Sequence, residues 1–145
     1  MFEIFHFIKP YHCCCVSIFG FLYPMYLYYL KPDKSIYENG CFVLTLLTIC
    51  CNQIFWIDPV RFSLRHKIDG AVAKITFLYY VFYTINKKTL SVIEMNQYYQ
   101  VVFFLGSSFY ISNYFSSKNW CCNYHLIYHI IFHYTASRGM IYAFL

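Results

Sequence analysis

Charged residues are scarce in this sequence. Asp, Glu, Lys and Arg make up 12% of its 145 residues, whereas a soluble globular domain usually contains about 25%. A small soluble protein has too much surface to cover with so few charges. Hydrophobic residues make up 60% of the chain. The composition therefore excludes an ordinary soluble domain and predicts an integral membrane protein.

Motifs with a fixed spacing are also missing. None of the eight cysteines forms a C-x-x-C pair, so we expect neither a zinc knuckle nor a thioredoxin-like redox site. The chain has no glycine-rich phosphate loop, nucleophile elbow or H-E-x-x-H motif. We interpret the cysteines as small apolar residues of membrane helices. Palmitoylation of those near the interface is the alternative.

The positive charges are not gathered into a stripe. The net charge is +5, from 11 Lys and Arg against 6 Asp and Glu, but the basic residues lie mainly in short gaps between apolar runs. We therefore predict no nucleic-acid partner and expect these residues to face lipid head groups. They divide almost evenly between the two sides of the predicted topology. The sequence thus selects neither an orientation nor a particular membrane.

The sequence contains five apolar runs separated by turn signals. A helix needs about 20 residues to cross a hydrocarbon core of about 30 Å, and unbroken apolar runs do not suit barrel strands. We predict an all-α, multi-pass transmembrane bundle of about five spans, with the two termini on opposite sides. It forms a single membrane domain over residues 1–145, with predicted spans at 11–30, 41–57, 70–85, 98–115 and 120–137.

Turn signals between the runs include Lys31-Pro32-Asp33-Lys34, Glu38-Asn39-Gly40 and Asp58-Pro59. The first four residues, Met1-Phe2-Glu3-Ile4, lack the basic region of a signal peptide, so no signal peptide is expected.

Three histidines recur at intervals of four residues in the fifth run: His125, His129 and His133. Residues four apart lie on one helix face, drifting about 40° per step, so the imidazoles form a stripe that descends into the membrane. An ionisable side chain in a span usually faces the bundle interior. With five spans, Asp69 and His66 lie at the same side of the membrane as His125, and so do Asn52 and His12.

Two interpretations of this stripe compete. The first is a metal site, with zinc as the expected ion, His125 and His129 as ligands, and His66 or Asp69 as the third ligand. Asp69 would alternatively act as the catalytic base for a metal-bound water. The second interpretation is a set of hydrogen bonds between helices, with no catalysis.

Asp69 and the histidine stripe also resemble a motif of a known protein family. Asp69-Gly-Ala-Val-Ala-Lys-Ile followed by His125-x-x-x-His129 resembles the CREST membrane hydrolases, which include alkaline ceramidases and adiponectin-receptor-like proteins. Those proteins have seven spans, with a Ser-x-x-x-His motif in an early span, an Asp near the next and His-x-x-x-His in the last. The resemblance implies a zinc-dependent lipid amide or ester hydrolase, with His125 and His129 as zinc ligands and Asp69 as the family Asp.

This chain departs from the CREST pattern upstream. Asn52-Gln-Ile-Phe-Trp56 stands where Ser-x-x-x-His is expected, and Ser63-Leu-Arg-His66 has those residue types at another spacing. The resemblance therefore describes a degenerate relative.

From the sequence we expect a small multi-pass, non-enzymatic membrane protein with a histidine-lined polar interior. Its expected partner is the lipid bilayer. The alternatives are the zinc-dependent hydrolase, which implies a lipid ligand, and a transporter or proton-conducting subunit, which also uses intramembrane histidines.

Overall fold

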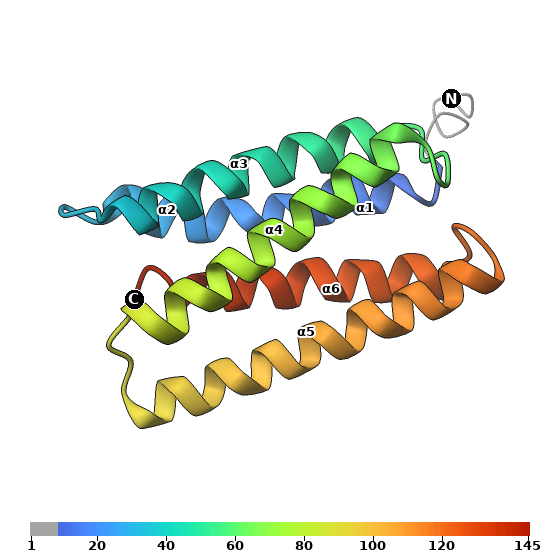
Figure 1. Ribbon diagram of the computed structural model, residues 1–145. Helices are drawn as coiled ribbons and strands as arrows, with labels where there is room; N and C mark the ends of the chain where they lie inside the picture. The colour runs from blue at the N-terminus through green and yellow to red at the C-terminus, as the bar shows by residue number, and fades with distance from the viewer. Residues whose placement is uncertain (1–8) are drawn as a thin grey trace, which may run out of the picture.

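The computed structural model describes residues 9–145, and every regular element in that range is a helix (Figure 1). The prediction about Met1–Ile4 lies outside the described residues. α1, the short 3₁₀ helix η2 and α2 follow one another directly and form one N-terminal helix. The all-α prediction is confirmed. The elements are α1 (His12–Ser17), η2 (Ile18–Phe21), α2 (Leu22–Leu30), α3 (Ile36–Trp56), α4 (Leu64–Lys87), α5 (Val92–Lys118) and α6 (Asn123–Ile141).

Three of these helices are long and apolar enough to cross a membrane. They are the N-terminal helix, His12–Leu30, together with α3 and α4. This agrees with an integral membrane protein. α5 and α6 are also long, at 27 and 19 residues, but α5 carries five serines and α6 carries three histidines.

The helices begin at capping residues rather than at the first apolar residue. Ser35 accepts a hydrogen bond from the backbone N–H of Glu38, whose carboxylate accepts one from the Ser35 N–H, so α3 begins at Ile36. Glu38-Asn39-Gly40, which we predicted as a turn, therefore forms the start of α3. Ser91 and Glu94 make the same capping box at the start of α5. These boxes satisfy backbone donors that the helix leaves free.

The N-terminal helix is the centre of the arrangement. It contacts both α3 and α6, while α4 packs on α3 and α5 packs on α6. The connections α2–α3 and α4–α5 lie at one end of the bundle, which we call the lysine end after Lys31, Lys34, Lys87 and Lys88. α1 begins at the opposite end, where α3–α4 and α5–α6 connect. We call this the histidine end, after His12, His66 and His125.

The helix interfaces are polar and the outer faces are apolar. Thr45 bonds the Tyr80 hydroxyl and Thr48 bonds Thr76 between α3 and α4, both at 2.8 Å. Valines, leucines and phenylalanines instead cover the outside. Membrane helices pack in this way, because lipid does not drive apolar side chains inward. The buried polar residues are Glu38, Thr45, Thr48, Asn52, Asp69, Thr76, Thr84, Ser108, Ser112, Ser116, His125, His133 and Ser137.

Two apolar clusters complete the interior. One, at the histidine end, contains Cys14, Phe55, Trp56 and Leu126. The other runs from the middle of the bundle to the lysine end and joins all the helices: Ile18, Phe21, Cys41, Tyr80, Tyr83, Leu105, Ala136, Met140, Ala143 and Phe144.

Tyr79 of α4 packs directly against Gly40 of α3. A Cβ atom built on Gly40 would overlap the phenol ring of Tyr79. The Tyr79 hydroxyl donates a hydrogen bond to the carbonyl of Tyr37 at 3.3 Å. The absence of a side chain at Gly40 is therefore what lets Tyr79 reach the α3 backbone.

We expect Gly40→Ala to lower the stability of the bundle by about 1 kcal/mol, because the Tyr79 ring must move and lose its hydrogen bond. Gly106→Ala is the matched control, since outside its own helical turn no described residue lies within 4 Å of a Cβ built there. It should raise stability by about 0.5–1 kcal/mol through helix propensity. Thermal unfolding in detergent measures both. Equal stability of the two variants would show that Gly40 is not a packing requirement.

Candidate functional site

The structure places the predicted histidines of three helices at one end of the bundle. The His66 ring stacks on Phe55, with ring centroids 5.0 Å apart, and lies 5.2 Å from Trp120. His125 lies 5.0 Å from the same Trp120 ring. The Nε2 atom of His12 lies 3.4 Å from the Ile57 carbonyl oxygen. Topology alone predicted this gathering, and the aromatic rings that fill it were not predicted.

His66 caps the start of α4. Phe62 has a left-handed backbone, with φ of 63°, and its N–H donates to Nδ1 of His66 at 3.0 Å. The backbone N–H of His66 donates to Oγ of Ser63 at 3.2 Å. Ser63 therefore caps the backbone of His66, while the His66 ring accepts the N–H of Phe62, one residue before the position that Glu caps in a capping box.

His125 repeats this arrangement at the start of α6. Cys121 has φ of 57°, and its N–H donates to Nδ1 of His125 at 3.2 Å. The N–H of His125 donates to Sγ of Cys122 at 3.5 Å. Phe62 and Cys121 are the two non-glycine residues with positive φ within residues 9–145. Their unusual backbone thus serves the same purpose at both helix starts.

The hydrogen bonds of the two caps determine which ring nitrogen of His66 and His125 carries the proton. A nitrogen that accepts an N–H bond has its lone pair occupied, so a neutral ring carries its proton on Nε2. A histidine that binds a metal through Nε2 normally donates a hydrogen bond from Nδ1. In His66 and His125, by contrast, Nδ1 accepts a hydrogen bond and Nε2 carries the proton. The Ser-x-x-His spacing of Ser63 and His66 was the sequence signal for this cap.

His133 joins three helices through hydrogen bonds. Ser17 of α1 donates its hydroxyl to the Cys14 carbonyl at 3.0 Å, so Oγ accepts from Nδ1 of His133 at 2.7 Å. Nε2 of His133 then accepts from Nδ2 of Asn52 on α3 at 3.3 Å. Each donor meets an acceptor, and the ring is neutral with its proton on Nδ1.

His129 lies between the other two histidines and has an unused nitrogen. Its ring is 4.8 Å from Trp56 and 4.6 Å from His133, measured between centroids. Nε2 of His129, Nε1 of Trp56 and Oδ1 of Asn52 are buried and have no hydrogen-bond partner among residues 9–145.

Asp69 is buried on α4, with 8% of its surface exposed. It lies near the Cys51 thiol of α3. Among the described residues no ion pair joins it to a histidine; the ion pairs there link Glu38 to Lys31 and Lys88. Asn52, which the predicted topology places at the same side of the membrane as His125, bonds to His133 of the histidine helix.

The predicted ligand set is not assembled as a metal centre in this geometry. Within residues 9–145, no group of three or more histidine, cysteine, aspartate or glutamate side chains could hold a metal ion. His66 and His125 both pack on Trp120, and His129 lies deeper, against Trp56.

If the caps stabilise the helix starts, His125→Leu should lower stability by about 1–3 kcal/mol, because the Cys121 N–H loses its acceptor. His125→Gln retains an acceptor oxygen and should recover at least half of that loss. Tyr124→Leu, at an exposed position beside it, serves as the control. Denaturant unfolding in detergent gives the three values. Equal losses in the Gln and Leu variants would contradict the capping role.

No protein-family model, curated protein or solved structure matches this chain. The CREST resemblance therefore stays a prediction that rests on its own residues.

Proposed function

We propose that this chain is a five-span, non-enzymatic integral membrane protein in which the histidine stripe holds the helices together. The observation that carries the proposal is the bonding of His133, which reaches Ser17 on α1 and Asn52 on α3. Both ring nitrogens are occupied by helix-to-helix bonds. Histidine and asparagine act in this way between membrane helices.

The outer faces of α5 and α6 support five spans. α5 exposes Phe103, Phe104 and Tyr110 and buries three serines spaced four residues apart, Ser108, Ser112 and Ser116. Small residues at this spacing let membrane helices approach closely. α6 likewise exposes apolar side chains, Tyr124, Ile127, Ile131 and Tyr134, opposite its buried histidines.

The zinc-dependent hydrolase is the alternative, and the bonding of the histidines disfavours it. Zinc binding through Nε2 of His66 or His125 would require the neutral ring either to lose its remaining proton, which is on Nε2, or to move that proton to Nδ1 and give up the helix cap. Asn52, at the position of the missing upstream motif, is already bonded to His133.

A transporter or proton-conducting role gains no support from these contacts. Glu38 is bonded to Lys31 and Ser35 at the lysine end, and Asp69 makes no ion pair with the stripe among the described residues.

The bonding role predicts that His133→Leu lowers stability by about 1–3 kcal/mol, since Ser17 and Asn52 lose their shared partner inside the bundle. Thr135→Val is the control on the same helix, because its hydroxyl donates to the Ile131 carbonyl of α6 itself. Unfolding in detergent compares the two. A loss no larger than that of the control would remove the observation on which the proposal rests.

Elemental analysis separates the proposal from the hydrolase. The purified protein should contain no stoichiometric zinc, and His129→Gln should leave the zinc content unchanged. Stoichiometric zinc that disappears in a folded His129→Gln variant would establish the metal site and overturn the non-enzymatic assignment.

Five spans require the two termini to lie on opposite sides of the membrane. Reporter tags at each end, assayed for accessibility in intact cells and after permeabilisation, should give opposite results. If both tags lay on the same side, the number of spans would be even, which would refute the five-span topology.

A further inference from the structure

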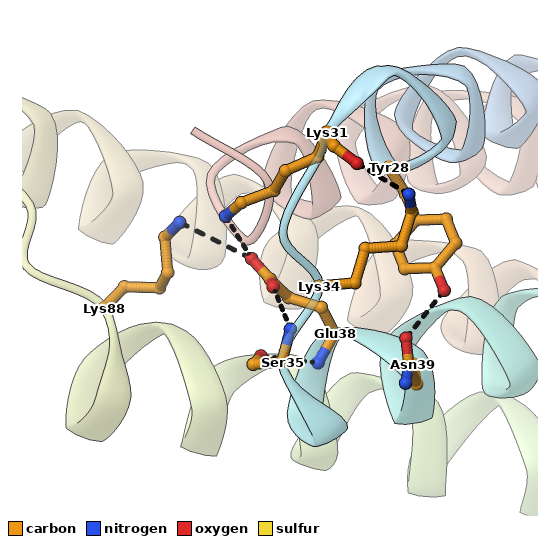
Figure 2. A network of polar contacts seen from close by, with 7 residues as sticks. All are labelled: Tyr28, Lys31, Lys34, Ser35, Glu38, Asn39 and Lys88. Atoms are coloured by element: carbon orange, nitrogen blue, oxygen red, sulfur yellow. Dashed lines mark hydrogen bonds and ion pairs between the residues drawn. The ribbon is translucent and has the colours of Figure 1, made fainter.

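The lysine end contains a hollow of about 640 Å³ between the α2–α3 and α4–α5 connections. Four lysines line it: Lys31 and Lys34 from the first connection, and Lys87 and Lys88 from the end of α4. Figure 2 shows that Lys31 and Lys88 point toward the same carboxylate from the two connections. The hollow therefore joins segments that are far apart in the sequence.

Glu38 is the buried anchor of this group, with 2% of its surface exposed. Its Oε1 atom lies 2.5 Å from Nζ of Lys31 and 3.9 Å from Nζ of Lys88. Its Oε2 atom accepts the Ser35 backbone N–H at 2.8 Å. The single negative charge of Glu38 is thus shared by two ammonium groups and a helix cap.

The hollow has an excess of positive charge. The charged side chains of its lining are four lysines and two carboxylates, Glu38 and Asp33, which leaves an excess of +2 among the side chains. The Lys88 side chain is only 12% exposed, and its pairing with Glu38 is long, at 3.9 Å. Burial, together with the nearby Lys31, lowers the pKa of Lys88, against the opposing effect of Glu38. A further anion would relieve this imbalance, because a buried charge without a full partner is costly.

The other two lysines are held in place without using the carboxylate of Glu38. Nζ of Lys34 donates to the Lys31 carbonyl at 2.6 Å and lies over the Tyr28 ring. Nζ of Lys87 lies over the Tyr37 ring, 5.5 Å from its centroid. Both ammonium groups are therefore positioned at the hollow with donors to spare.

Large apolar side chains adjoin the charged lining. Leu30 and Ile36 flank the α2–α3 connection in the sequence, and Val92 and Ile93 follow the α4–α5 connection; all four are exposed. A soluble anion would gain nothing from such a rim. A ligand with an anionic head and apolar chains would use both surfaces.

We propose that this hollow binds the phosphate of an anionic phospholipid that has a phosphomonoester head group. A phosphomonoester carries nearly two negative charges at neutral pH, which complements the side-chain excess of +2 in the lining. The acyl chains lie along Leu30 and Ile36. This inference rests on the membrane embedding proposed above, but not on the number of spans, because every lining residue except Leu145 belongs to α3, α4 or the α2–α3 and α4–α5 connections.

The test is binding of short-chain lipids to the purified full chain in detergent, measured by native mass spectrometry. Dioctanoyl phosphatidic acid is the probe, with dioctanoyl phosphatidylcholine and inorganic phosphate as comparisons. Lys34→Gln/Lys87→Gln removes two ammonium groups but leaves the Glu38 pairs intact. Lys67→Gln/Lys118→Gln removes two exposed lysines at the histidine end and is the matched control.

We expect phosphatidic acid to bind more tightly than either comparison. The Lys34/Lys87 variant should weaken that binding about 25-fold, from about 5-fold per lysine near a membrane surface, and the control less than about 2-fold. Equal binding of phosphatidylcholine, or an equal loss in the control, would overturn the site. Inorganic phosphate binding as tightly as the lipid would overturn the lipid assignment. A failed five-span topology in the tag experiment would leave these results interpretable.

Discussion

Many buried polar groups of this bundle bond to one another across helices, as membrane helices require because lipid offers no hydrogen-bond partner. That constraint explains why α3 faces α4 through Thr45–Tyr80 and Thr48–Thr76 pairs. It also explains the chain from Asn52 through His133 to Ser17, in which each donor meets one acceptor. The apolar side chains are free to face outward. The helices are therefore aligned by polar contacts, and apolar packing fills the space between those contacts.

The helical class was predictable because it depends on the composition of long segments. Five unbroken apolar runs leave the backbone little choice in a membrane. The helix ends were not predictable from hydropathy, since they depend on single polar residues. Ser35 and Glu38 start α3 inside a segment that resembles a turn. Ser63 and His66 do the same for α4, with His66 in the place that Glu occupies in a familiar capping box.

The inward stripe of histidines was predictable from spacing, but its chemistry was not. Topology places residues in the same half of a membrane, whereas a ligand set requires agreement within a few tenths of an ångström. The left-handed backbone of Phe62 and Cys121 directs an N–H to Nδ1 of His66 and His125, and nothing in the sequence of these two residues signals that conformation. The unpartnered atoms of Asn52, Trp56 and His129 likewise arise from the meeting of two helices.

The distribution of indole rings has a spectroscopic consequence. The chain has two tryptophans, Trp56 and Trp120, and both lie at the histidine end with ring centroids 6.4 Å apart and nearly parallel planes. Each also contacts an imidazole ring. Emission from indole therefore reports on one end of the molecule alone. Events at the lysine end are silent in that signal, and the 17 tyrosines, which occur in every helix from α2 to α6, give the complementary absorbance of the whole bundle.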